Sequence, residues 1–274
     1  MSIQLRLPDQ AAQNLSRHID SLVADKVASR IAAKDFTLWG KDAEAESSMR
    51  LGWVTSAVDS QVLVESIIPL RDRFRAEQVD RFVLCGMGGS SLAPEVITKT
   101  AGVELVVLDS TNPDQVRAAL SGDIHRTAII VSSKSGSTVE TDSQKRVFEK
   151  AFKDAGIDVT KRVVIVTDPG SPMEAAAHTA GYQVFNADAT VGGRYSALTA
   201  FGLVPSGLAG VDIEALLNQA IEASSQLRVD DATNPGLILG AALAAWVNAG
   251  TKVDKVGIVA DQSSIVGFGD WPSS

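Results

Sequence analysis

Five short apolar runs between residues 81 and 186 constrain the fold of this sequence more than any other feature. Their hydrophobic residues follow one another without alternating with polar ones, which is typical of parallel strands buried on both faces of a sheet. Helix-like stretches separate the runs, and strands that alternate with helices predict a doubly wound α/β fold. The predicted strands are 81–86, 104–109, 127–133, 162–168 and 182–186.

The helix predicted over 137–156 is the clearest of those between the strands. Its predicted apolar stripe consists of Val147, Phe148, Ala151, Phe152 and Ala155, and Gly156 is expected to end it. The stretch 171–174 predicts another helix start, because Ser171 can cap it and Pro172 suits its first turn.

The sequence predicts three parts. Residues 1–77 are expected to form a helical section that packs on the sheet, 78–208 the sheet domain, and 209–274 the start of a second α/β domain. In the third part we expect an amphipathic helix, a strongly apolar helix with Leu237, Ala241, Ala242, Ala245 and Trp246 facing inward, and a sixth strand at 255–260. Because no helix or partner strand follows that strand, we expect the second domain to be truncated and the chain to be a fragment.

Composition narrows the class of protein. Hydrophobic residues make up 45% and charged residues 21%, as in ordinary globular proteins. No apolar run reaches the roughly 18 residues of a membrane span, and the N-terminus lacks the layout of a signal peptide. The single Cys85 cannot form an internal disulfide, so we expect a cytoplasmic protein without a membrane partner.

Charge and histidine content disfavour two further kinds of site. The formal net charge of −8 argues against a nucleic-acid partner. His18, His125 and His178 are scattered, and no Cys/His cluster has zinc spacing, so no metal site is expected.

The loop expected after the first strand, 85–95, is rich in glycine and serine. Its glycines allow backbone N–H groups to approach a ligand closely, and a helix N-terminus favours an anion. The pattern Gly86-x-Gly88-x-x-Ser91 lacks the third glycine of a dinucleotide fingerprint.

The loop after the third strand, 131–141, contains six hydroxyl side chains. Ser137 and Glu140 match a capping box, but capping does not account for Ser133, Ser135 and Thr138 as well. Hydroxyls can donate to phosphate oxygens, and Lys134 adds positive charge. We therefore interpret this loop, "VSSKSGSTVET", as a phosphate cradle.

The third unusual loop, 189–203, follows the fifth strand. Gly192 and Gly193 allow close backbone approach, and Arg194 offers a rigid fork of donors that suits an oxyanion.

Three segments occur in this order at suitable separations: "GMGGSSLAP" (86–94), "SSKSGSTVET" (132–141) and "DATVGGRYSALTAFGLVP" (188–205). Together they make the chain resemble the glucose-6-phosphate isomerase (phosphoglucose isomerase) family of sugar-isomerase domains, in a form similar to bacterial members. The resemblance covers most of the chain and is weakest over the first ~60 residues; it implies a flavodoxin-like sheet.

The resemblance implies the interconversion of glucose 6-phosphate and fructose 6-phosphate through a cis-enediol intermediate, a step of glycolysis and gluconeogenesis, with no cofactor or metal. The implied catalytic residue is Arg194, which would stabilise the enediolate. The implied partner is a small-molecule sugar phosphate. The implied substrate- and phosphate-binding residues are Gly88, Gly89, Ser90, Ser133, Lys134, Ser135, Thr138 and Gly193.

The family's general base is a glutamate shortly after the first strand of the second domain. Here the predicted sixth strand is followed by "DQSSIVGFGDWPSS", and no glutamate occurs after Glu222. We therefore expect the phosphate site and the arginine without the base, and negligible isomerase activity from this chain alone. The resemblance also implies a homodimer for the family.

Two other functions remain open at this point. Sugar-isomerase domains also serve as non-catalytic sensors in regulators, but the N-terminal section shows no basic recognition helix. A nucleotide-binding Rossmann protein would need the complete glycine pattern and an acidic residue placed on a ribose. A fluorescence titration that compares NAD with a sugar phosphate separates these interpretations.

Overall fold

The computed structural model describes residues 3–7, 9–247, 255–259, 263–269 and 271. The chain divides into two compact units: Met1–Thr55 with Asn218–Ile258, and Ser56–Leu217 with Val259–Ser274. These limits, at 55/56 and 217/218, differ from the predicted domain limits at 77/78 and 208/209.

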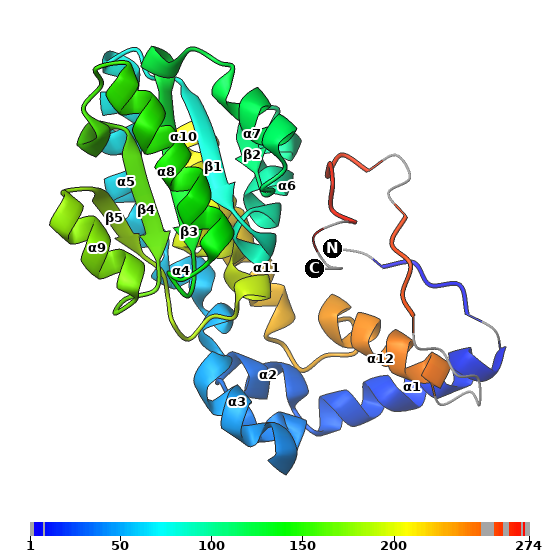
Figure 1. The fold of residues 1–274 in the computed structure, drawn as a ribbon. Coiled ribbons are helices and arrows are strands. Elements are labelled where there is room, and N and C mark those ends of the chain that lie inside the picture. The colour runs from blue at the N-terminus through cyan, green and yellow to red at the C-terminus, as the bar shows by residue number, and fades with distance from the viewer. Residues whose placement is uncertain (1–2, 8, 248–254, 260–262, 270, 272–274) are drawn as a thin grey trace. The chain divides into compact units, whose positions relative to one another are not determined.

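The second unit contains a five-stranded sheet in the order β2-β1-β3-β4-β5 (Figure 1). All four neighbouring pairs are parallel, which confirms the doubly wound α/β fold. The order reverses between β1 and β3, and this is where ligands bind in open sheets of this kind. The strands are β1 (Arg81–Gly86), β2 (Val106–Leu108), β3 (Thr127–Ser133), β4 (Val163–Thr167) and β5 (Gln183–Asn186).

One face of the sheet is covered by α7 (Pro113–Leu120), α8 (Val139–Asp154) and α9 (Pro172–Ala180) (Figure 1). Phe148 and Phe152 of α8 are fully buried against the strands. The continuous apolarity of the strands is explained by this cover and by the helices on the other face.

The other face is covered by α5 (Gln61–Ala76), α6 (Leu92–Ala101) and α10 (Ala200–Ala209). Phe74 of α5 meets Phe82 of β1 edge to face, with ring centroids 5.6 Å apart. Helix α10 is buried along its whole length, so its sequence is apolar on all sides.

Phe148 and Phe152 of the predicted apolar stripe of α8 are fully buried and Ala151 and Ala155 half-buried, but Val147 was assigned to the stripe wrongly. Val147 is 37% exposed, whereas Thr141 and Gln144 are buried in line with Phe148. Residues 141, 144, 148 and 152 are spaced three or four apart and share one face, and position 147 is rotated about 100° from its neighbour. The helix ends as expected, with Gly156 at φ +70°.

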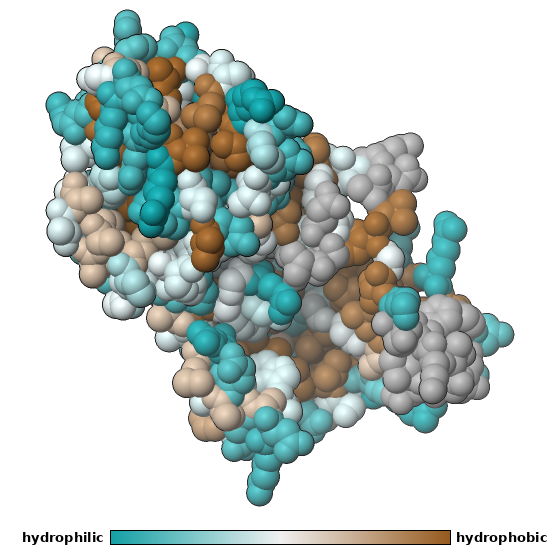
Figure 2. Space-filling model, in the orientation of Figure 1, coloured by the Kyte–Doolittle hydropathy of each residue, from teal (hydrophilic) through white to brown (hydrophobic). Residues whose placement is uncertain are grey.

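The first unit is helical and combines the N-terminal part of the chain with a segment more than 160 residues later, 218–258. Helices α1 (Asp9–Ala24), α2 (Val27–Ala32) and α12 (Pro235–Val247) contribute most of the lining of an open apolar hollow of about 490 Å³, and Figure 2 shows apolar residues gathered beside α2. Leu237, Ala241, Ala242 and Ala245 are buried as predicted, while the side chain of Trp246 lies outside the described residues. The other helices of the described chain lie in both units. They are α3 (Glu44–Arg50), α4 (Ser56–Asp59), α11 (Ile213–Leu227) and the short 3₁₀ turns Phe36–Trp39, Lys41–Ala43, Gly52–Val54, Gly88–Ser90, Ile124–Arg126, Val159–Lys161 and Gly193–Leu198.

The prediction of a sixth strand is wrong for the part that the structure describes. Residues 255–259 pair with no other strand of the described chain, and Val256 and Val259 are 71% and 87% exposed. An apolar run becomes a strand only when a neighbour exchanges backbone hydrogen bonds with it. Residue 260 lies outside the described residues. Among the helices that are described, none is long and apolar enough to cross a bilayer.

Candidate functional site

The candidate site lies at the carboxyl edge of the sheet. The parallel strands β1, β3 and β5 release their three unusual loops at this one edge, and β1 and β3 flank the point where the strand order reverses. The glycine loop of the site is 87–91, the hydroxyl loop is 133–138, and the arginine segment is 192–195.

The glycine loop and the arginine segment touch through their backbones. A Cβ added at Gly89 would lie 2.8 Å from the carbonyl oxygen of Gly193 and 3.4 Å from the amide nitrogen of Arg194. Real Cβ atoms do not approach a backbone oxygen so closely, so residue 89 must be a glycine for the two segments to meet. The turn that starts at Gly88, with φ +55°, is held by the Ser91 hydroxyl, which donates to the Gly88 carbonyl at 3.0 Å.

The same glycine loop also reaches the end of β3. A Cβ added at Gly86 would lie 3.3 Å from the carbonyl oxygens of both Ser132 and Ser90. Ser90 therefore lies near the end of β3, where the hydroxyl loop begins. The structure thus brings the three predicted segments together at one edge, while the binding roles of their residues stay predictions.

The hydroxyl loop is organised by hydrogen bonds among its own side chains. Ser133 Oγ lies 3.0 Å from Thr138 Oγ1 and accepts from the Gly136 amide at 3.2 Å. The Ser137 hydroxyl donates to Ser135 Oγ at 3.0 Å. These bonds hold several hydroxyls in one small loop just before α8.

The predicted capping box at Ser137 does not form. Thr138, and not Ser137, is the N-cap residue of α8, and its side chain makes no capping bond within the described structure. Ser137 is engaged by Ser135 instead. Because the first amides of a helix have no partner inside the helix, the start of α8 keeps the donors and dipole that favour an anion. By contrast, Ser171 does cap α9, accepting from the Glu174 amide at 3.1 Å.

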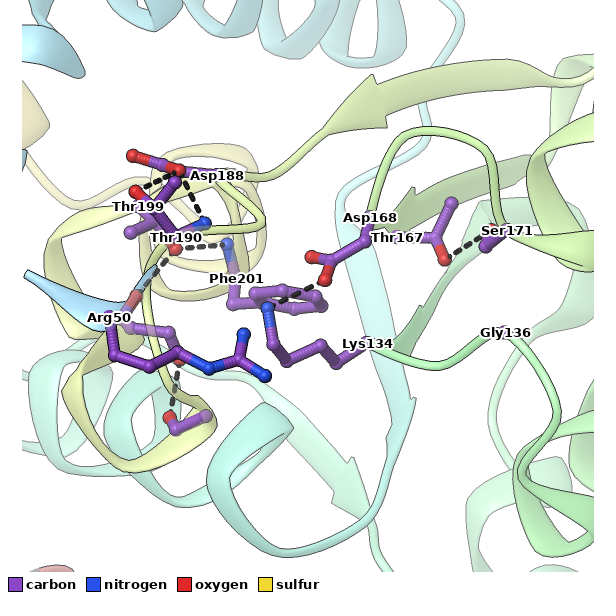
Figure 3. Close-up of polar contacts among 12 residues, drawn as sticks. Arg50, Lys134, Gly136, Thr167, Asp168, Ser171, Asp188, Thr190, Thr199 and Phe201 are labelled. Carbon is purple, nitrogen blue, oxygen red and sulfur yellow. Dashed lines mark hydrogen bonds and ion pairs between the residues drawn. The ribbon is translucent and has the colours of Figure 1, made fainter. Parts of the chain in front are cut away.

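An ion pair that the sequence did not predict joins the loops after β3 and β4 (Figure 3). Lys134 Nζ lies 2.6 Å from Asp168 Oδ2, and the two side chains are only 26% and 18% exposed. The signal available in the sequence was the position of Asp168 directly after a buried strand. Without knowing that β3 and β4 are neighbours, nothing links this residue to Lys134.

The arginine segment is fixed on both sides. Before it, Asp188 accepts from the amide and hydroxyl of Thr190 at 2.7 and 2.6 Å (Figure 3). Arg194 lies on the 3₁₀ turn Gly193–Leu198 and is exposed. After it, Thr199 caps α10 through the Phe201 amide at 3.3 Å.

Other reactive groups lie apart from this chemistry. Cys85 is completely buried, and burial raises the pKa of its thiol to about 12, so it is a poor nucleophile at neutral pH. His125 and His178 lie on other elements: His125 on a 3₁₀ turn before β3, and His178 on α9, 3.8 Å from Glu174. Within the described residues, no three His, Cys, Asp or Glu side chains gather as metal ligands would.

Comparison with known proteins identifies the family. The sequence model of the family "Phosphoglucose isomerase" matches residues 73–264. A probable glucose-6-phosphate isomerase of Haloarcula marismortui is 35% identical over 219 residues, which cover 78% of this chain and 48% of that protein. A glucose-6-phosphate isomerase of Thermus thermophilus is 34% identical over 230 residues, covering 82% and 52%.

Solved structures agree. A hypothetical protein from Thermus thermophilus matches 89% of this chain and 57% of its own, with a TM-score of 0.70 and 30% identity. A glucose-6-phosphate isomerase from Chlamydia trachomatis, 23% identical, shares the fold with a TM-score of 0.65 over 89% of this chain and 51% of its own. The chain spans about half the length of the curated relatives it matches. With a family model that covers most of its length and relatives that match in sequence and fold, the chain belongs to the phosphoglucose isomerase family.

Proposed function

We propose that this chain binds a sugar phosphate at the carboxyl edge of its sheet, where the glycine loop, the hydroxyl loop and the arginine segment meet. The observation that carries the proposal is the backbone contact of Gly89 with Gly193 and Arg194. This contact has no evident role in the core of the sheet. It brings the backbone of the arginine segment against the glycine loop, whose Ser90 lies near the end of β3.

The hydroxyl loop suits the phosphoryl group. Ser135 and Thr138 offer hydroxyl donors, and each bond to a charged oxygen is worth about 1.5–3 kcal/mol. Ser133, only 2% exposed, orders the loop through Thr138 and Gly136. The N-terminus of α8 adds about 0.3–1 kcal/mol for an anionic group. A dianion can be held in this way without a large basic patch, in keeping with a chain of net charge −8.

We further propose that the reaction served by this site is the interconversion of glucose 6-phosphate and fructose 6-phosphate. Arg194 is suited to stabilise the enediolate, since one well-placed donor to an oxyanion contributes about 2.7–4 kcal/mol. A proton must also move between C1 and C2, which requires a general base. A coupled assay that follows the conversion of fructose 6-phosphate tests this part of the proposal.

The binding test is calorimetric titration with 6-phosphogluconate, a sugar-acid phosphate. We expect binding to the unaltered chain and about tenfold weaker binding to Arg194→Ala, because a charge-assisted hydrogen bond is lost. The matched control is Arg117→Ala on α7, whose side chain is 75% exposed and paired with Asp114. Absence of binding, or equal weakening in both variants, contradicts the proposal. The homodimer and the cytoplasmic location stay predictions, and sedimentation analysis tests the first.

A further inference from the structure

The loop that follows β4, residues 168–171, braces the hydroxyl loop. The Asp168 amide donates to the Lys134 carbonyl at 3.4 Å, which continues the β3–β4 ladder by one step. A Cβ added at Gly136 would lie 2.9 Å from both Cβ and Oγ of Ser171, so the two loops are also in contact at their far ends. The place of the hydroxyl loop therefore depends on the loop after β4.

Asp168 adds a charged contact to this brace. Its Oδ2 accepts from Lys134 Nζ at 2.6 Å. Its Oδ1 is buried and has no hydrogen-bond partner among the described residues. If Lys134 left, a carboxylate that is only 18% exposed would lose its compensating charge, which is unfavourable because little water reaches it. The pair is therefore expected to persist when a ligand binds.

An ammonium group has three donors, so Lys134 can keep Asp168 and still donate to a ligand. Lysine has a flexible stem, and fixing that stem in advance lowers the entropy lost on binding. Asp168 also repels a bound dianion, which works in the opposite direction. The favourable fixing of the lysine stem requires Lys134, whereas the repulsion by Asp168 acts with or without it.

We propose that Asp168 is a positioning residue, which holds the Lys134 ammonium at the hydroxyl loop so that it meets a phosphoryl group from a fixed place. The inference rests on the proposed function, since it concerns the same site. It adds a residue that acts on the ligand through another side chain.

The test is a double-mutant cycle with Lys134→Met, Asp168→Asn and the double variant, titrated with 6-phosphogluconate. We expect Asp168→Asn to weaken binding about three- to tenfold when Lys134 is present, a coupling typical of residues in contact. When Lys134 is Met, the same change should tighten binding, because only the repulsion is removed. Asp168→Glu, which retains the charge, should recover part of the loss.

A merely structural role would change binding by the same factor in both backgrounds, and that result overturns the inference. So does tighter binding of Asp168→Asn in the presence of Lys134. If the unaltered chain does not bind 6-phosphogluconate at all, the proposed function fails and this inference fails with it; binding without coupling rejects this inference alone. The control is Asp114→Asn, which removes an exposed carboxylate that is paired with Arg117 on α7.

Thermal unfolding provides a second readout that needs no ligand. Lys134→Met should lower the melting temperature, because it leaves the partly buried Asp168 carboxylate uncompensated, and adding Asp168→Asn should restore much of the loss. An additive loss in the double variant shows that the two side chains do not act as a pair and overturns the inference.

Discussion

At the scale of single residues, the site depends on the absence of a side chain at Gly89 as much as on the side chains around it. The carbonyl of Gly193 occupies the place where a Cβ would be, so the glycine loop and the arginine segment meet through backbone atoms. Gly88 is different: its φ is +55°, and an added Cβ would meet no atom within 4 Å. Two adjacent glycines are therefore needed for different reasons, one for space and the other for conformation.

This difference predicts different outcomes for two alanine variants. Gly89→Ala forces two backbone segments apart and should cost about 1–3 kcal/mol of unfolding free energy, as overpacking does. Gly88→Ala should cost about 1–2 kcal/mol, the penalty of a left-handed conformation for a residue with a Cβ. Urea unfolding measures both.

Ligand titration separates the two variants further. Gly89→Ala should lose most of its affinity for 6-phosphogluconate, because the arginine segment shifts, whereas Gly88→Ala should lose less. If Gly89→Ala matches the unaltered chain in stability and binding, the close contact is not formed in solution.

At the scale of elements, strands were easier to predict than their surroundings. The predicted limits of β1 and β3 coincide with those observed. Each strand is paired on both sides, and every residue of its apolar run takes part in strand pairing. β2 is an edge strand with one neighbour and keeps only Val106–Leu108 of the predicted 104–109. The run at 255–259 has no partner among the described residues and forms no strand.

The site was predictable in its segments and not in its contacts. Motif order placed the glycine loop, hydroxyl loop and arginine segment correctly, because the ends of parallel strands share one edge. The Lys134–Asp168 pair depends on β3 lying next to β4, and that order is a property of the sheet. The capping box failed because α8 starts one residue later than the box requires, with Thr138 as its N-cap residue, and such a shift is not visible in spacing.

The correction to α8 predicts a contrast between neighbouring residues. Phe148 is fully buried and Val147 is 37% exposed. Phe148→Ala should lower the free energy of unfolding by about 3–5 kcal/mol through lost burial and a cavity. Val147→Ala should change it by about 0.5 kcal/mol or less, as surface substitutions do. Urea denaturation checks both, and comparable losses would show that Val147 is buried together with Phe148, as first predicted.

At the scale of the whole molecule, the first unit is closed by residues from distant parts of the chain. The amide and hydroxyl of Ser29 on α2 donate to Asp230 at 3.0 and 2.5 Å, across 201 residues of sequence. Asp231, the next residue, bonds instead to Thr233 within its own turn. Only the first of these adjacent carboxylates connects two distant segments of the unit.

The pH dependence of this connection gives the last prediction. The hydroxyl of Ser29, followed by its amide, lowers the pKa of Asp230, so the carboxylate is stabilised in the folded state. A lowered pKa means that the contribution to stability is present above about pH 4, the ordinary aspartate value, and is lost as the pH falls through the lowered one. The protection of the α2 amides against hydrogen exchange, relative to the intrinsic exchange rate at each pH, should therefore fall over that acidic range. In Asp230→Ala this protection should already be low near neutral pH, with little further change on acidification, while Asp231→Ala should behave like the unaltered chain at α2. If the α2 amides are equally protected in both variants, the bond between Ser29 and Asp230 does not hold α2. Removing the carboxylate of the local turn would then have the same effect as removing the long-range one.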